Sequence, residues 1–437
     1  MNGRPLGAGG AALALGLLWA CGGGPADGGA LPSLAVELTP ALEAGLLRAS
    51  PLPPLPPDPT NRVADDPAAA RYGQALFHDA RFSRDGSVAC ATCHQVEHGL
   101  SDGRQLALGL ALGTRSTPTL WNAAYHRWLT WDGRADSLWM QALDPPEDPR
   151  EMDVTRAGVV RRIASVPEYR AAHTALFGEL PAALDSADIP ERARPARPGE
   201  AADTAEVRAW EALSAEVRAA IDRVYVDFGK ALAAYQRRLV RGDAPFDCFV
   251  RGLRERDDRL VAALSPAAQR GAALFFGRAN CVLCHSGPNF SDGEFHNNSL
   301  PTLDGQPPRD SGRYGGAAAL KTSPFHAGGP FSDAPDGERA LAVRQLRTSS
   351  ETWGEFRTPS LRNLAGRAPF MHEGQLADLA AVVHFYDTLE GQSGRNHHQE
   401  RLLVPLGLSE GDRADLLAFL EALEGAPLDP SWLGPPH

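Results

Sequence analysis

The chain has 437 residues, of which 43% are hydrophobic and 22% are charged, and its formal net charge is −11 at pH 7. This length allows two domains with separate cores, and the composition is that of an ordinary globular protein. The acidic balance excludes a nucleic-acid-binding role, because neutralising phosphates requires a basic surface; an acidic protein instead attracts basic partner proteins.

The first 21 residues are predicted to be an export signal of the lipoprotein type. Arg4 precedes the apolar run ALALGLLWA, which is too short to span a bilayer as a helix. The run ends in LWAC, which resembles a lipobox with Cys21 as the acylated residue; simple cleavage is the alternative. Residues 22–60 are rich in Gly and Pro, and we expect a flexible tether there. The predicted location is the periplasm, with the membrane contacted only through a lipid on Cys21.

A duplication divides the rest of the chain into residues 61–245 and 246–437. The stretch DPAAARYGQALF (66–77) resembles SPAAQRGAALFF (265–276), and both begin with a helix-start signal. Each stretch leads to a CxxCH motif and then to Ser-Asp-Gly. Apolar residues recur at helical spacing in residues 206–240, whereas strand signals are scarce. Residues 296–340 hold many Gly and Pro and are expected to be loops. The predicted fold is therefore mainly α, with two related domains in tandem.

The repeated CxxCH motif predicts one covalent c-type haem in each domain. Two cysteines at this spacing can each form a thioether to a haem vinyl group, and the adjacent histidine then becomes the axial ligand of the iron. Zinc would require four protein ligands at one site, and a redox CxxC would belong to a βαβ pattern; neither is present. The predicted domains are thus cytochrome c-like, with haem residues Cys90, Cys93 and His94 in the first and Cys281, Cys284 and His285 in the second.

The remaining cysteine, Cys248, has no predicted partner once Cys21 and the two motifs are assigned. We expect it to be a small buried side chain in FDCFV.

Four further stretches resemble the bacterial di-haem cytochrome c peroxidase and MauG family. They are STPTLWNAAYHRWLTWDGRADSLWMQAL (116–143), DPREM (148–152), FRTPSLRNLAGRAPFMHEG (356–374) and VVHFY (382–386). The resemblance extends over roughly residues 60 to 425, in the same order. It implies a peroxide-reacting haem in the N-terminal domain and an electron-transfer haem in the C-terminal domain.

The resemblance also implies ligands for the two irons. Tyr386 occupies the position of the second axial ligand of the C-terminal haem, as in the MauG-like branch, with Met371 and His384 as alternatives. Leu110 occupies the position of the removable histidine that blocks the N-terminal haem in the peroxidases. Leucine cannot bind iron, so this haem is expected to be open at rest. His98 and His126 are weaker substitutes for the missing ligand.

The remaining site residues are likewise implied by the resemblance. Glu151 is the expected acid/base group above the N-terminal haem, with Gln141 as its polar neighbour. Trp131 is expected between the two haems, and Arg134 beside a haem propionate. A candidate calcium site lies near Ser116, Arg367 and Pro369, although Ser116 replaces the asparagine that binds the ion in the family.

Three functions are compatible with these residues. The leading one is reduction of hydrogen peroxide with electrons from a small periplasmic donor, either a c-type cytochrome or a cupredoxin. The second is peroxide-dependent oxidation of residues, such as tryptophan, in a partner protein. The third is a non-catalytic electron carrier, which would require a second ligand on both irons. A homodimer is a candidate assembly, because members of the family are often dimeric.

Overall fold

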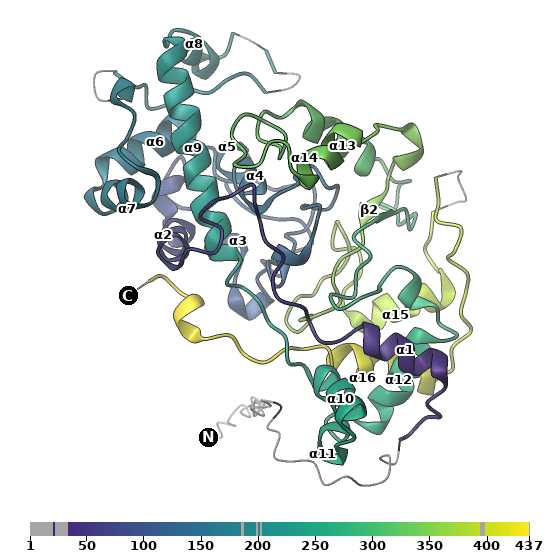
Figure 1. Ribbon diagram of the computed structural model, residues 1–437. Helices are drawn as coiled ribbons and strands as arrows, with labels where there is room; N and C mark the ends of the chain where they lie inside the picture. The colour runs from purple at the N-terminus through teal and green to yellow at the C-terminus, as the bar shows by residue number, and fades with distance from the viewer. Residues whose placement is uncertain are drawn as a thin grey trace, which may run out of the picture.

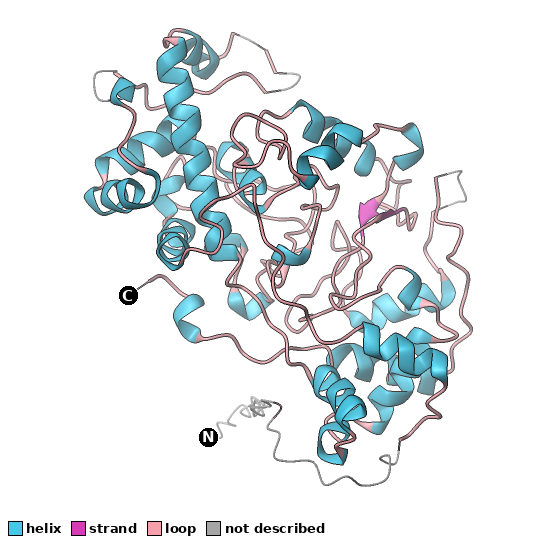
Figure 2. Cartoon of the chain, in the orientation of Figure 1, coloured by secondary structure: helices cyan, strands magenta, loops and turns pink. Residues whose placement is uncertain are grey.

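The computed structural model describes Cys21 and residues 34–184, 188–197, 200–201, 203–393 and 398–436. The predicted signal peptide before Cys21 and residues 22–33 of the predicted tether lie outside the described residues. Figures 1 and 2 show a chain dominated by helices and long connecting loops, with one short two-stranded sheet. The mainly α prediction is confirmed.

The helices fall into an N-terminal and a C-terminal group. The first comprises α2 (Pro67–His78), α3 (Cys90–Cys93), α4 (Leu138–Gln141), α5 (Asp144–Glu147), α6 (Arg156–Ser165), α7 (Pro167–Phe177), α8 (Ala205–Glu211) and α9 (Ala215–Gln236). The second comprises α10 (Pro245–Glu255), α11 (Asp258–Val261), α12 (Pro266–Phe276), α13 (Arg313–Thr322), α14 (Glu338–Gln345), α15 (Leu379–Thr388) and α16 (Glu410–Glu421). The strands β1 (Phe295–His296) and β2 (Phe356–Arg357) pair antiparallel, and α1 (Pro40–Arg48) precedes both groups.

The duplication is visible in two equivalent helix crossings. In each half, a glycine of the helix before the CxxCH motif lies against the backbone of a second helix. α2 begins after Asp66 and α12 after Ser265, whose side chains accept hydrogen bonds from the first turn of each helix. A Cβ atom on Gly73 of α2 would collide with the backbone carbonyl of Ala231 in α9. A Cβ atom on Gly271 of α12 would collide in the same way with a carbonyl of α16. Each domain therefore places its CxxCH motif after a helix that lies unusually close to its partner.

A segment near each end of the chain packs on the core of the other domain: α1 on the C-terminal core and Trp432 on the N-terminal core. α1 packs through Leu46 on the C-terminal core, together with Leu42 and α12. At the other end, Trp432 packs on the N-terminal core, and its ring lies 3.6 Å from the Arg71 guanidinium of α2. Figure 1 shows α1 beside α12 and the yellow C-terminal segment running back towards α2. The tether prediction is therefore wrong for residues 40–60. α1 and the hydrogen bond from Ser50 to Asp247 fix the first part of this segment to the C-terminal domain. At its end, the Thr60 hydroxyl accepts a hydrogen bond from the Trp139 indole of the N-terminal domain.

A second correction concerns residues 296–340, which were expected to be loops. This stretch contains α13 and the start of α14. Three buried residues of this region belong to the N-terminal core although they follow the second CxxCH motif. They are Leu320 of α13, Phe325 in the loop after it, and Val343 of α14. The two halves are thus joined by shared core residues as well as by the chain itself.

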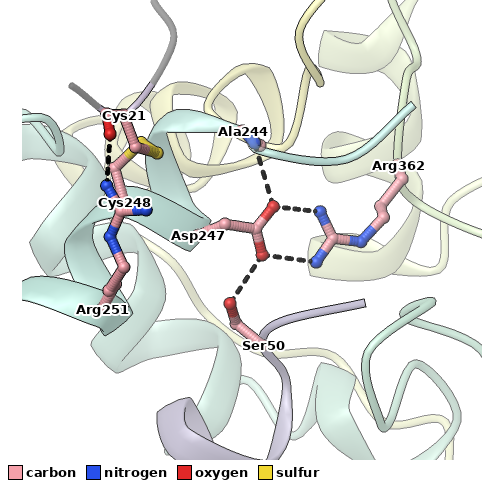
Figure 3. Close-up of a disulfide and its surroundings, with 7 residues drawn as sticks. All are labelled: Cys21, Ser50, Ala244, Asp247, Cys248, Arg251 and Arg362. Carbon is pink, nitrogen blue, oxygen red and sulfur yellow. Dashed lines mark hydrogen bonds and ion pairs between the residues drawn. A yellow bond between two sulfur atoms is a disulfide. The ribbon is translucent and has the colours of Figure 1, made fainter. Parts of the chain in front are cut away.

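The third correction concerns Cys248. It is buried, as expected, but it has a partner, because it forms a disulfide with Cys21 (Figure 3). The Arg251 guanidinium donates a hydrogen bond to the Cys21 carbonyl, 2.6 Å away, and fixes the same segment on α10. A lipid thioether at Cys21 would need the sulfur that this disulfide uses, so the structure contradicts the predicted anchor at Cys21. In the same view, Asp247 accepts two hydrogen bonds from the buried Arg362 guanidinium, which ties α10 to the loop after β2.

No helix in the described part of the chain is long and apolar enough to cross a membrane.

Candidate haem sites

Both motif histidines present the same nitrogen for an axial bond. The Nδ1–H of His94 donates to the Leu100 carbonyl at 2.8 Å, and the Nδ1–H of His285 donates to the Phe290 carbonyl at 3.0 Å. A carbonyl can only accept, so each ring carries its proton on Nδ1 and leaves the Nε2 lone pair free. Burial lowers the pKa of both histidines, which favours the neutral, ligating form. This arrangement suits each histidine to binding a metal through Nε2.

The C-terminal motif lines a cavity of about 230 Å³. Cys281, Cys284 and His285 lie on its wall, and Tyr386 of α15 lines it as well. Most of the other lining side chains are apolar, including Phe275, Leu364, Val383 and Leu420. This arrangement suits a flat apolar macrocycle with one axial ligand supplied by His285.

The cavity distinguishes among the candidate second ligands. Tyr386 is held by Asn298, whose side-chain amide donates to the phenol oxygen at 2.8 Å, and burial raises the pKa of Tyr386. Met371 also lines the cavity. His384 does not: its side chain is 51% exposed and pairs with Glu390 at 3.1 Å. Tyr386 and Met371 therefore stay candidates for the second iron ligand, and His384 does not. Asn298 is a site residue that the sequence analysis missed.

Glu151 lies beside the N-terminal motif. Burial raises the pKa of Glu151 to about 7, with further contributions from the negative charges of Asp148 and Asp144. The Glu151 charge in turn contributes to raising the pKa of Cys93, after burial, so the two groups are close. A carboxyl that titrates near neutrality can both accept and donate a proton, as an acid/base group must. Gln141 ends α4 and is half-buried; no hydrogen bond of its side chain joins it to Glu151 within the described residues.

The loop that carries Leu110 packs directly on Glu151. The backbone N–H of Leu110 donates to the Glu151 carbonyl at 2.9 Å, and a Cβ atom on Gly109 would clash with the Glu151 backbone. The leucine thus lies next to the predicted acid/base residue and offers no ligand atom. Neither substitute histidine is better placed. His98 is in the turn just after the motif, and His126 is buried against the Arg357 guanidinium at 3.0 Å.

Trp131 joins the two halves. Its indole N–H donates to the Ser116 carbonyl at 2.9 Å, and its own carbonyl accepts from the backbone N–H of Arg357 in β2. The ring lines the C-terminal cavity, 6.5 Å from the ring of His372. An indole at the junction of the domains is the position expected for an electron relay.

A cluster of charged side chains lies at this junction, and of its members only Arg134 was predicted from the sequence. Asp132 pairs with Arg134 at 3.1 Å and with Arg115 at 2.7 Å. Arg115 also pairs with Asp310 of the C-terminal half at 2.7 Å. Burial alone would raise the pKa of Asp132, but Arg134 and Arg115 outweigh it and lower the value to about 2. Asp132 is therefore ionised and holds both arginines in place.

The side chains at the candidate calcium position do not favour a cation. The Ser116 hydroxyl donates to the Met371 carbonyl at 2.8 Å and offers no amide oxygen. The guanidinium of Arg367 is buried and lines the adjacent cavity, where its positive charge would repel a divalent ion. These side chains do not fit calcium, and the backbone carbonyls of Arg367 and Pro369, which the resemblance names as ligands, stay a prediction.

Comparison with known proteins agrees with this geometry. The family model described as di-haem cytochrome c peroxidase matches residues 67–255. Methylamine utilization protein MauG of Methylorubrum extorquens is 35% identical over 363 residues, which cover 83% of this chain and 79% of that protein. Cytochrome-c peroxidase IdrP1 of Denitromonas iodatirespirans is 33% identical over 406 residues, covering 90% and 92%. The crystal structure of a MauG-like protein associated with microbial copper homeostasis superposes with a TM-score of 0.59 at 26% identity, covering 88% of this chain and 98% of that one.

Proposed function

The chain belongs to the di-haem cytochrome c peroxidase family, and on this premise we propose that it reduces hydrogen peroxide at an open N-terminal haem, with electrons relayed through the C-terminal haem. The chain is a peroxidase-type oxidoreductase, and the family implies haem cofactors. The observation that supports the proposal is the backbone hydrogen bond from Leu110 to Glu151, which brings a residue without a ligand atom next to the proposed acid/base residue, whose pKa burial raises to about 7.

Haem, when bound, supplies the redox centre with which peroxide reacts. Glu151 takes a proton from one peroxide oxygen and returns it to the other, which makes water the leaving group. Two electrons and two further protons complete the conversion of one peroxide to two waters. Trp131 would carry electrons between the domains, and Tyr386 would serve with His285 to hold the C-terminal haem. We propose that both haems are attached through thioethers, at Cys90 and Cys93 and at Cys281 and Cys284.

The proposed electron donor is a small basic c-type cytochrome or a cupredoxin, because a net charge of −11 favours encounter with a basic protein. The proposed location is the periplasm.

The disulfide between Cys21 and Cys248 can be tested directly. Peptide mapping by mass spectrometry without reduction is expected to find the Cys21 peptide joined to the Cys248 peptide. An acylated Cys21 peptide would contradict the disulfide.

Partner-protein oxidation is the second candidate, and Tyr386 in the C-terminal cavity is the observation that favours it. A hard anionic phenolate stabilises the ferric state, which makes the haem a weaker acceptor from ordinary electron donors. The resemblance to proteins named MauG points in the same direction.

Steady-state kinetics separates the two candidates. The haem-loaded protein is mixed with peroxide and a reduced small cytochrome c or cupredoxin, and oxidation of the donor is followed by absorbance. Turnover that saturates with donor and oxidises two one-electron donors per peroxide supports the peroxidase. Absence of donor oxidation, with peroxide-dependent tryptophan oxidation in a co-purified protein, would instead support partner oxidation.

A further inference from the structure

Two buried guanidinium groups line the C-terminal cavity. Arg357 of β2 is 8% exposed and Arg367 is 6% exposed, and both are among the cavity-lining residues. The Arg357 guanidinium donates to the carbonyls of Thr130 and Thr358 and contacts the His126 ring. Arg367 has a buried Nε without a hydrogen-bond partner.

Neither group is neutralised. Across the described residues, no salt bridge joins Arg357 or Arg367 to a carboxylate, in contrast to the buried Arg362, which pairs with Asp247 at 2.8 Å. Burial lowers the pKa of both arginines to about 10, and the charge of Arg367 contributes to the shift at Arg357. Both therefore remain positively charged at neutral pH. Two buried, unpaired positive charges destabilise the fold unless an anion joins them.

The cavity is also the predicted haem pocket, and a haem carries two propionate anions. We propose that Arg357 and Arg367 bind the propionates of the C-terminal haem, and that their guanidinium groups supply the positive charge that an interdomain calcium ion would otherwise provide. The inference rests on the C-terminal haem of the proposed function and is independent of peroxide turnover.

The residues at the candidate calcium position support this assignment independently. The Ser116 hydroxyl and N–H donate to the carbonyls of Met371 and His372, at 2.8 and 2.7 Å. These bonds join the two halves directly through protein groups. Trp131 donates to the carbonyl of the same serine, so the electron-relay residue is positioned by this closed junction.

The first test is metal analysis of the haem-loaded protein. The protein is equilibrated with calcium chloride, desalted and measured for calcium, and its absorption and EPR spectra are recorded before and after a calcium chelator. We expect far less than one calcium per chain and unchanged haem signals. One bound calcium per chain, or a chelator-induced change in the C-terminal haem signals, would overturn the proposal.

The second test measures the midpoint potential of the C-terminal haem in Arg367→Met and Arg367→Lys, with haem content determined for each. Loss of the positive charge stabilises the ferric state, so Arg367→Met is expected to lower the potential and to make it more dependent on pH near neutrality as a propionate titrates. Arg367→Lys keeps the charge and is expected to restore most of the potential. The control is Arg270→Met, because Arg270 is 49% exposed and pairs with Asp415 on the surface. An unchanged potential in Arg367→Met with full haem content would contradict the assignment.

Discussion

At the residue scale, the carboxyl group of Glu151 combines burial with neighbouring negative charge. Its pKa of about 7 is above the ordinary value of a glutamate because burial and Asp148 both disfavour the ionised form. The proton-accepting form is therefore the minor species below pH 7 and the major species above it. We expect kcat/KM for peroxide to rise about tenfold per pH unit below neutrality and to level off above it.

Glu151→Gln removes the group that moves the proton. We expect kcat/KM to fall by about 10²–10⁴-fold and its dependence on pH to disappear. Glu168→Gln is the matched control, because Glu168 is an exposed residue at the start of α7. A Glu151→Gln enzyme with wild-type kinetics would show that another residue moves the proton.

The neighbours of Glu151 shift its pKa in opposite directions. Asp148 raises this pKa and Arg134 lowers it. We therefore expect the acidic limb of the pH profile to move to lower pH in Asp148→Asn and to higher pH in Arg134→Gln. If the acidic limb of the kcat/KM profile stays at the same pH in both variants, a group other than Glu151 titrates there.

Tyr386 is the second residue whose role can be measured directly. Tyr386→Phe removes the phenol oxygen, and we expect altered EPR of the C-terminal haem and a higher midpoint potential, because the ferric state loses an anionic ligand. His384→Ala is the control, since that side chain is half-exposed and paired with Glu390. Identical spectra for Tyr386→Phe and the wild type would leave Met371 as the ligand.

At the element scale, α1 and the C-terminal segment with Trp432 join the two domains, because each packs on the core of the domain at the other end of the sequence. Leu46 of α1 is 2% exposed and packs in the C-terminal core. Leu46→Ala is expected to cost about 2–5 kcal/mol and to lower the denaturant midpoint of the C-terminal domain, followed by the absorption of its haem. Leu341→Ala, at a site 49% exposed, is expected to have little effect. A loss confined to the N-terminal domain would contradict the packing of α1.

The same elements show what the sequence could and could not predict. The helix-start signals at Asp66 and Ser265 and the CxxCH motifs specify local structure, so the helical class and the duplication could be read from them. Leu38, Leu42 and Leu46 are spaced four residues apart and could have signalled α1, but the surrounding Pro and Gly suggested a tether. The contact of Trp432 with Arg71 and the Cys21–Cys248 disulfide join residues hundreds of positions apart, and no local pattern specifies such pairs.

At the scale of the whole molecule, the two halves meet at a junction of paired charges. Arg115 joins Asp132 of the N-terminal half to Asp310 of the C-terminal half, and Trp131 bridges Ser116 and β2. The sequence analysis identified Trp131, but it could not predict the partners that hold it, because these come from both halves. The roles of Tyr386, Glu151 and Arg134 stay predictions, and the variants described above test them.

The proposed function depends on an N-terminal haem that is open at rest. To test this, one equivalent of hydrogen peroxide is added to the fully ferric protein, and absorption and EPR spectra are recorded within milliseconds. With Leu110 in place of a ligand, we expect a prompt change in the haem signals without prior reduction. A ferric protein that stays unchanged until one haem is reduced would show that a side chain blocks the N-terminal iron, and the open haem would be refuted.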